Sequence, residues 1–158
     1  MQTTPDLQFE PITRADLPEL TAVMTRAFDD DSHKHLGKER GGPPGYDDGS
    51  FFETWLFGYE QTTGHKLLLE GTLVGGVIVW DMADGHNFLG TIFVDPAYQD
   101  RGIGTRAWQF VEASYTRAKS WQLGTPIWAT KNHHFYENKC GFSRHEVKED
   151  EIIYRKEM

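Results

Sequence analysis

Val94-Asp95-Pro96-Ala97-Tyr98-Gln99-Asp100-Arg101-Gly102-Ile103-Gly104-Thr105 lies between an apolar run typical of a strand and an amphipathic run typical of a helix. The first N–H groups of a helix have no internal partner and carry the positive end of its dipole, so such a junction can hold an anion. Gly102 and Gly104 would leave the approach of a phosphate unobstructed. The stretch lacks the Gly-Lys-Ser/Thr of a Walker loop and the third glycine of a dinucleotide fingerprint. It therefore predicts a phosphate-binding turn of another kind, with an ordinary flexible turn as the alternative.

Apolar periodicity on both sides of this turn predicts a chain in which helices interrupt strands. Strands are expected at residues 7–12, 65–70, 73–80, 86–94, 121–125, 142–147 and 151–156. Helices are expected at residues 17–28, after a cap at Thr13 or Asp16, at residues 50–61 and 104–118, and in a short segment ending at Cys140-Gly141. The helical pattern stops after Asp29-Asp30-Asp31, and the Gly- and Pro-rich residues 32–50 predict a long loop. The fold class is therefore α/β or α+β around one sheet, with an antiparallel meander at its centre.

The composition limits the kinds of protein that the chain can be. With 158 residues, 38% of them hydrophobic and 25% charged, the chain has the size of one globular domain, residues 1–158. Its net charge of -8 argues against a nucleic-acid partner. The acidic excess is concentrated in residues 1–60, as either a solvated surface or an acidic rim that steers a cationic substrate. No bilayer-spanning apolar run and no signal-peptide pattern is present, so a cytoplasmic location without membrane association is expected; the lone Cys140 agrees with a reducing compartment.

Two motifs together give the chain a family resemblance. The run Val-Asp-Pro-x-Tyr-Gln-x-x-Gly-x-Gly, followed downstream by Phe135-Tyr136-Glu137-Asn138-Lys139-Cys140-Gly141-Phe142, resembles the GCN5-related N-acetyltransferase (GNAT) superfamily over nearly the whole chain. The resemblance implies one mixed, mainly antiparallel sheet that is splayed at an acyl-CoA site and flanked by helices. It also implies that the glycine turn binds the pyrophosphate of acetyl-CoA, while the preceding strand pairs with the pantetheine arm. The implied coenzyme-binding residues are Ile92, Phe93, Val94, Gln99, Asp100, Arg101, Gly102, Ile103, Gly104 and Thr105.

The resemblance assigns a general acid and leaves two further roles open. Tyr136 would protonate the coenzyme A thiolate as it leaves, which suits a phenol with a pKa of about 10; a core aromatic residue is the alternative. Most members have an asparagine seven residues before this tyrosine, but Ala129 stands there in this chain. Asn132, about one turn later, is the candidate for that coenzyme contact. No glutamate stands in the strand before the turn, so the general base stays open among His86, a water relayed to Asp81, and water alone.

The resemblance places the choice of acceptor in residues 28–60. The candidate substrate-binding residues there are Asp31, Tyr46, Asp47 and Asp48. Because acidic side chains steer cations, the expected acceptor is a cationic amine such as a polyamine, a basic antibiotic or a lysine-containing peptide. The predicted function is direct transfer of an acyl group, with acetyl-CoA as the expected donor, to a primary amine in a ternary complex. The alternatives are a non-catalytic acyl-CoA sensor of the same fold and a nucleotide-phosphate-binding domain of an unrelated fold.

Other conspicuous side chains have simpler interpretations. His33, His35, His133 and His134 lack the spaced partners of a zinc site, so they are expected to be solvated and no metal is expected. Cys140 is expected to be a small apolar residue at a helix end rather than an acyl-carrying nucleophile. The expected partners are acetyl-CoA and the amine, and the chain is compatible with a homodimer.

Overall fold

The structure is a computed structural model, and it describes residues 6–158. The elements follow the order expected from the sequence. Their bounds are β1 (Leu7–Pro11), η1 (Arg14–Asp16), α1 (Leu17–Leu36), α2 (Ser50–Trp55), β2 (Thr62–Leu69), β3 (Thr72–Trp80), β4 (His86–Val94), η2 (Pro96–Tyr98), α3 (Ile103–Ser114), β5 (Ser120–Pro126), α4 (Thr130–His134), the π-helical η3 (Phe135–Lys139), β6 (Ser143–Val147) and β7 (Glu151–Glu157).

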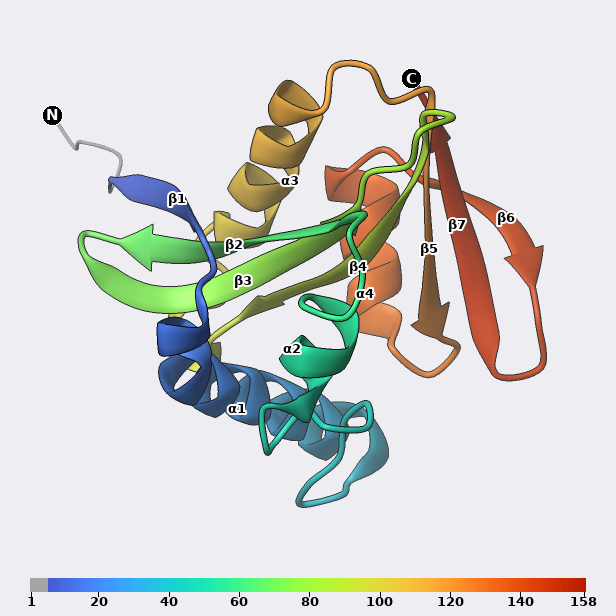
Figure 1. The fold of residues 1–158 in the computed structure, drawn as a ribbon. Helices are drawn as coiled ribbons and strands as arrows, with labels where there is room; N and C mark the ends of the chain where they lie inside the picture. Colours follow the sequence, from blue (N-terminus) through green and yellow to red (C-terminus); the bar gives the residue numbers. More distant parts are fainter. Residues whose placement is uncertain (1–5) are drawn as a thin grey trace, which may run out of the picture.

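The described strands form one seven-stranded sheet in the order β1-β2-β3-β4-β5-β7-β6 (Figure 1). Neighbouring strands are antiparallel except for β4 and β5, which are parallel. The expected class, a mixed and mainly antiparallel sheet flanked by helices, is therefore confirmed. Within residues 6–158, no helix is both long enough and apolar enough to cross a bilayer.

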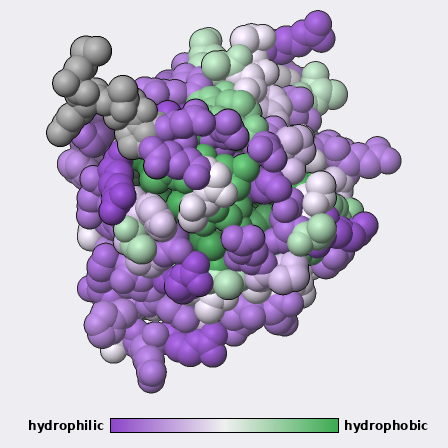
Figure 2. Space-filling model, turned by 90° about the vertical axis from the view of Figure 1, so that its left-hand side faces the viewer, coloured by the Kyte–Doolittle hydropathy of each residue, from purple (hydrophilic) through white to green (hydrophobic). Residues whose placement is uncertain are grey.

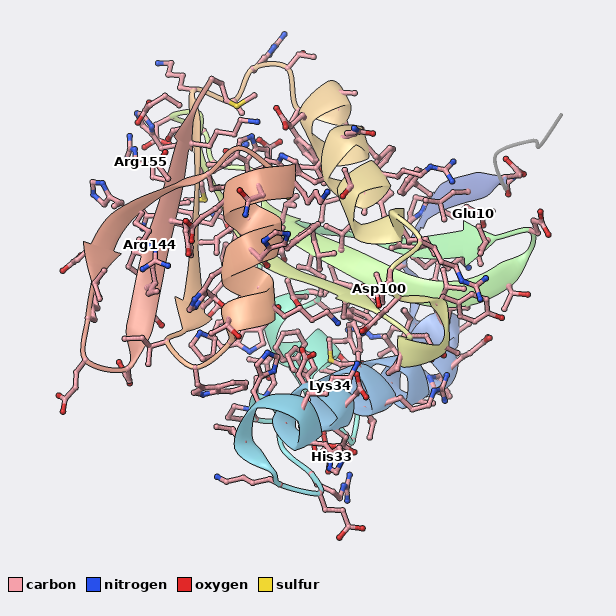
Figure 3. All side chains as sticks on the ribbon, turned by 180° about the vertical axis from the view of Figure 1, so that it is seen from behind. Glu10, His33, Lys34, Asp100, Arg144 and Arg155 are labelled. Atoms are coloured by element: carbon pink, nitrogen blue, oxygen red, sulfur yellow. The ribbon has the colours of Figure 1, made fainter. Side chains whose placement is uncertain are left out.

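Helices pack on both faces of the sheet and create two cores. One core joins the sheet to α3 and η3, and Trp108, Trp121 and Tyr154 are fully buried in it. The other core joins the opposite face to α1 and α2, with Leu20 and Phe52 fully buried. From behind, α3 and α4 lie in front of the sheet and α1 crosses below it (Figure 3). From the side on which β1 lies, the surface is mostly hydrophilic, with a band of apolar residues at its centre (Figure 2).

A bulge in β4 changes the face of the sheet toward which its side chains point. Val79 pairs with Leu89 and Ile78 pairs with Thr91, so Gly90 is the extra residue. A Cβ on Gly90 would lie 3.1 Å from the Ile78 carbonyl oxygen, which explains why the bulge carries a glycine. Before the bulge Leu89 packs in the core with α3; after it Phe93 packs in the core with α1.

The first helix is longer than the sequence pattern predicts. α1 continues through the three aspartates to Leu36, where the pattern predicted a loop from residue 32, because Asp30 forms an i,i+4 ion pair with Lys34 at 2.9 Å. The helix ends at Gly37, which is left-handed at φ 64° and donates its N–H to the His33 carbonyl oxygen. The loop is therefore residues 37–49, shorter than expected.

Two other helices are shorter than expected. α2 ends at Trp55 rather than near residue 61. The chain then turns toward β2, and the hydroxyl of Thr62, the first residue of β2, donates to the Leu56 and Tyr59 carbonyl oxygens within this turn. α3 ends at Ser114 rather than at residue 118, and Tyr115 leaves the helical conformation at φ -111° and ψ 62°.

The N-terminal capping box joins Thr13 to Asp16, whose carboxylate accepts the Thr13 N–H at 2.8 Å.

Candidate active site

β4 and β5 separate soon after they begin. They pair only at His86 with Ser120, Asn87 with Trp121 and Phe88 with Gln122, whereas β4 continues beside β3 to Val94 and β5 continues beside β7 to Pro126. Among the described strands, none pairs with the stretch of β4 after Phe88 on its β5 side. This opening, which we call the split, lies between residues 89–94 of β4 and 123–126 of β5.

The backbone of β4 presents hydrogen-bonding groups to the split. The Asp95 N–H donates to the Val74 carbonyl oxygen of β3, and the Phe93 carbonyl oxygen lies only 2.2 Å from where a Cβ on Gly75 would be. Residues of a strand direct their backbone groups alternately to one neighbour and the other. Ile92 and Val94 therefore direct theirs into the split, and Gln99 Nε2 donates to the Val94 carbonyl oxygen at 3.1 Å.

The turn after β4 takes a conformation that depends on left-handed residues. Asp100 has φ 62°, and Gly102, at φ 76°, stands immediately before the first residue of α3. A Cβ on Gly102 would meet nothing within 4 Å, so the backbone angle rather than space requires glycine there. The N–H groups of Ile103, Gly104 and Thr105 then form the first turn of α3, which is the anion-binding end of a helix.

Gly104 is explained by a packing contact. A Cβ on Gly104 would lie 3.2 Å from Cζ of Phe135 in η3, so the glycine lets the two helical segments approach each other. The sequence motif alone explains this glycine only by the approach of a phosphate. Its absent side chain also brings the residue before Tyr136 close to the glycine turn.

The buried carboxylate of the Val-Asp-Pro motif, to which the motif alone assigns no role, holds the start of the turn. Asp95, 7% exposed, accepts the Ala97 N–H at 3.1 Å and pairs with Arg26 of α1 at 2.6 Å. An Asp before a Pro is a recognisable turn signal. Its arginine partner stands 69 positions earlier in the chain, and no local pattern indicates that contact.

Tyr136 lies in η3, within the core that borders the split. Its ring contacts Phe135, Phe142 and Tyr154 at centroid distances of 5.2, 5.9 and 6.0 Å. Burial raises the pKa of this phenol well above its usual range, and Cys140 and Asp31 raise it further. Within residues 6–158 its hydroxyl forms no hydrogen bond. The phenol therefore stays protonated at neutral pH and has its proton available for a ligand.

The residues expected to complete the coenzyme site are on the β5 side. Ala129 is buried and stands immediately before α4. Asn132 donates its Nδ2 to Thr125 Oγ1 of β5 at 3.2 Å, so its side chain is held against the strand that borders the split. Lys131, next to it, donates to Gln99 Oε1 of the glycine turn. This contact connects the two sides of the split, and no local sequence pattern predicts it.

Asp31 is the one expected acceptor residue with an electrostatic interaction with Tyr136. It lies on α1, and burial raises the pKa of its carboxyl, while Lys131 and His35 act in the opposite direction. It also contributes to the raised pKa of Tyr136. Figure 3 shows that the same end of α1 brings Lys34 toward Asp100 in the glycine turn, and Asp100 helps to raise the pKa of Lys34.

The other expected acceptor residues have partners in α1, in the loop that follows it and at the start of α2. The Tyr46 hydroxyl donates to Asp29 at 2.6 Å and its ring is buried beside α1. Asp47 pairs with Arg40 at 3.1 Å, and Asp48 accepts the Ser50 hydroxyl at 2.6 Å. Asp29 also accepts the Gly41 N–H. These contacts fold the loop back onto α1.

The candidate bases lie at the paired end of the split. His86 is the first residue of β4, and its Nδ1 is 2.7 Å from Ser120 Oγ. Asp81 follows β3 and accepts Asn87 Nδ2 at 3.4 Å. Neither group lies in the open part of the split.

One histidine expected to be solvated is buried. His133 is 7% exposed, and its Nε2 is 3.0 Å from the Pro126 carbonyl oxygen, so it ties α4 to the end of β5. Cys140 is buried, and burial raises the pKa of its thiol to about 12, so the thiol is protonated at neutral pH.

Comparisons with known proteins agree with this geometry. The model of the acetyltransferase (GNAT) family matches residues 22–142. The uncharacterized protein YrkN of Bacillus subtilis (strain 168) is 32% identical over 139 residues, which are 87% of this chain and 74% of that protein.

Solved structures show the same fold at low identity. The PaiA N-acetyltransferase of Thermoplasma acidophilum, in complex with coenzyme A, has a TM-score of 0.78 at 15% identity, covering 97% of this chain and 99% of its own. An acetyltransferase of Thermus thermophilus has a TM-score of 0.81 at 17% identity, covering 99% and 100%. The ribosomal-protein-S18-alanine N-acetyltransferase of Escherichia coli has a TM-score of 0.75 at 18% identity, covering 95% and 92%.

Proposed function

The chain belongs to the GNAT family of acetyltransferases, and from this premise we propose that it transfers the acetyl group of acetyl-CoA directly to a primary amine. The observation that carries the proposal is the split, where β4 leaves β5 after Phe88 and ends at the glycine turn. An unpaired strand edge can bind an extended amide-bearing chain through its backbone. A helix N-terminus at the end of that edge can bind the phosphates that follow such a chain.

The residues present fit acetyl-CoA. Ile92 and Val94 offer backbone groups to the pantetheine arm, and the first turn of α3 offers N–H groups to the pyrophosphate. The PaiA structure, which resembles this chain, contains coenzyme A, and this supports the assignment. When bound, the coenzyme supplies an acetyl group activated as a thioester.

Two groups of the chain act on the reacting atoms in this proposal. A β4 N–H that faces the split, from Ile92 or Val94, donates to the carbonyl oxygen, where negative charge develops during attack. Tyr136 gives its proton to the sulfur as the C–S bond breaks. The amine reaches the carbonyl carbon from the face that carries α1 and α2.

A panel of primary amines tests the proposal. Purified protein is mixed with acetyl-CoA and each amine in turn, and release of the free thiol and acetylation of the amine are measured together. We expect stoichiometric thiol and acetylamide with at least one class of amine. Binding of acetyl-CoA in calorimetry without transfer to any amine would overturn the proposal and favour the non-catalytic sensor.

A further inference from the structure

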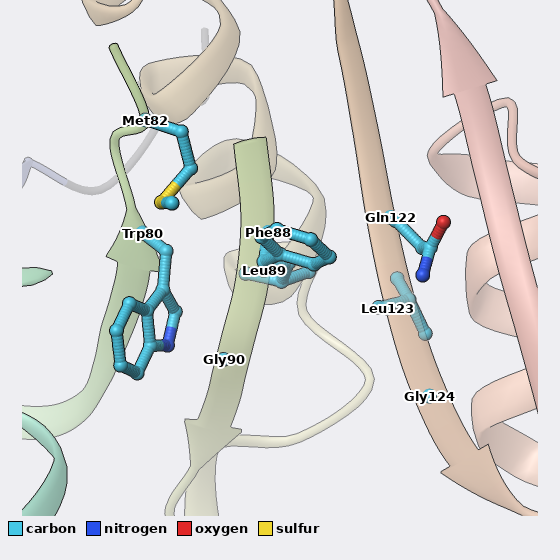
Figure 4. Close-up of a pocket in the computed structure, with 8 residues that line it drawn as sticks. All are labelled: Trp80, Met82, Phe88, Leu89, Gly90, Gln122, Leu123 and Gly124. Carbon is cyan, nitrogen blue, oxygen red and sulfur yellow. The ribbon is translucent and has the colours of Figure 1, made fainter. Parts of the chain in front are cut away.

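A cavity of about 410 Å³ lies beside the paired end of β4 and β5 (Figure 4). Its size is that of a small-molecule site. Figure 4 shows the Phe88 ring extending from β4 toward β5, with Trp80 and Met82 on the side of β3. The lining residues are Trp80, Met82, Phe88, Leu89, Gly90, Gln122, Leu123 and Gly124.

The alternation of the strands places this cavity on the acceptor side. Leu89 and Leu123 pack in the core with α3. Their strand neighbours Phe88 and Gln122 therefore face the opposite side, to which α1 and α2 are packed. The cavity thus borders the split from the face at which the proposed amine arrives.

Aromatic rings extend one wall of the cavity into solvent. Trp80 contacts Tyr59 at a centroid distance of 4.6 Å, and Tyr59 stacks on Trp55 at 5.9 Å. Trp55, Tyr59 and Phe88 remain 41%, 43% and 40% exposed. Large apolar side chains gathered around one concavity, yet left open to water, mark a surface built to contact an apolar ligand.

A carboxylate lies beside Gly124, one of the residues that line the cavity, near the point where the split opens. Gly124 lies two residues beyond Gln122, the last residue of β5 that pairs with β4. A Cβ on Gly124 would lie 3.0 Å from both the carboxyl carbon and Oε1 of Glu151 in β7, so the glycine makes room for this carboxylate. Within residues 6–158 the Glu151 carboxylate has neither an ion pair nor a hydrogen bond. It therefore remains available to a cationic group in the cavity.

Resting on the proposed acetyl transfer, we propose that the acceptor is a primary amine bearing an aromatic ring. The ring lies against Phe88 and Trp80, and the ammonium group is held by Glu151 at the edge of the split. Transfer forms the C–N bond and breaks the C–S bond. Of the two protons that the ammonium nitrogen loses, one passes to solvent and the other is balanced by the proton that Tyr136 gives to sulfur and then regains.

The experiment compares 2-phenylethylamine with n-butylamine and spermidine as acceptors. We expect kcat/KM for 2-phenylethylamine to exceed that for the other two about tenfold, the effect of a well-buried ring. Phe88→Ala should lower the ratio of 2-phenylethylamine to n-butylamine about tenfold and leave KM for acetyl-CoA unchanged. Val147→Ala, which truncates another exposed apolar residue on β6, should leave that ratio unchanged.

Glu151 is tested with a matched control in the same hairpin. Glu151→Gln should raise KM for 2-phenylethylamine about tenfold, because it removes the charge that holds the ammonium group. Glu149→Gln, in the exposed turn before β7, should change neither KM for 2-phenylethylamine nor KM for acetyl-CoA. An unchanged KM for 2-phenylethylamine in Glu151→Gln would overturn the role of this carboxylate.

A binding measurement separates this inference from the proposed function. Saturation-transfer NMR of 2-phenylethylamine with coenzyme A-loaded protein should show binding that Phe88→Ala weakens. Such binding without any acetyl transfer would support the cavity and overturn the proposed activity. Transfer to spermidine or n-butylamine at equal or higher kcat/KM, or no binding of 2-phenylethylamine, would overturn the aromatic acceptor.

Discussion

The two sides of the split are built in different ways. The coenzyme side is largely backbone: the free edge of β4, a left-handed turn and the first N–H groups of α3, all within residues 92–105. The proposed acceptor side is built of side chains from separate segments: Trp80 and Phe88 line the cavity, Tyr59 contacts Trp80, and Glu151 lies beside Gly124. A backbone site needs glycines and a strand end in one stretch of chain. A side-chain site exists only once the fold brings distant segments together.

This difference teaches where each kind of specificity resides. In the proposed site, backbone groups bind features that every acyl-CoA shares, so we expect the coenzyme side to tolerate changes of side chain but not of conformation. The proposed acceptor site depends on particular rings and one carboxylate, so single side-chain changes should alter the choice of amine without affecting the coenzyme. The following changes test that division, from the largest expected effect to the smallest.

Tyr136→Phe should give the largest effect, a loss of kcat in the acetyl transfer between coenzyme and amine. Loss of a general acid lowers kcat on the order of 10²-fold, whereas the coenzyme loses no contact that it needs for binding. Steady-state kinetics should therefore show a lower kcat with KM for acetyl-CoA nearly unchanged. An unchanged kcat would leave Tyr136 as a packing residue.

Gly102→Val should weaken acetyl-CoA binding about tenfold, because it disturbs the turn that directs the N–H groups of α3. Gly71→Val is the matched control. Gly71, in the β2–β3 turn, also has a positive φ, of 84°, and also has open space around its Cβ position. Both variants should lose similar stability in thermal unfolding. Equal affinity for acetyl-CoA in the two variants would contradict the proposal that this turn binds the pyrophosphate.

Replacing both Asp47 and Asp48 by Asn should have a smaller effect. Arg40 and Ser50 already occupy these carboxylates, so they contribute to the acceptor site mainly as a diffuse charge. We expect KM for the amine to rise by less than about threefold, with a weaker dependence on ionic strength. A larger rise in KM for the amine, with no remaining dependence on ionic strength, would show instead that the loop carrying these aspartates selects the amine.

Asp31→Asn should give the smallest effect, visible as a pH dependence of stability. Burial raises the folded-state pKa of Asp31, so the folded protein binds this proton more tightly than the unfolded chain does. Asp31 therefore lowers stability increasingly as pH rises above the unfolded pKa, and the penalty is complete above the folded pKa. Asn avoids this penalty, so thermal unfolding should show a gain at pH 7 that disappears on acidification. A gain of equal size at low pH would assign the effect to packing instead.

The coenzyme side could be predicted from the sequence to a large extent. The order of elements, the glycine turn and the place of Tyr136 follow from contiguous motifs, and the structure has them in one region. The sequence indicated Gly104 as part of a phosphate-binding turn but did not indicate its packing against Phe135, because that contact joins segments that are distant in the chain. The end of α1 was predicted too early, because a run of three aspartates suggests a loop unless the Asp30–Lys34 ion pair is known.

The acceptor side could not be predicted in the same way. Trp80 and Glu151 look like ordinary strand residues until the order β3-β4-β5-β7 brings them to one face. The Arg26–Asp95 pair likewise joins two separate elements. The acidic residues in and beside the loop at residues 37–49 suggested an acceptor site there, but most of their side chains have hydrogen-bond or ion-pair partners close by in the chain.

The short pairing of β4 with β5 also has a consequence for how the protein unfolds. Among residues 6–158, three residue pairs join the part of the sheet from β1 to β4 with the part from β5 to β6, although the helices pack across both. Backbone amides next to such a narrow junction open at a lower free energy than those in the centre of either part. A ligand that bridges the two parts raises that free energy according to its affinity. Amide hydrogen exchange near Phe88 and Gln122 should therefore slow on addition of coenzyme A, so that the substrate itself makes the two parts cooperative.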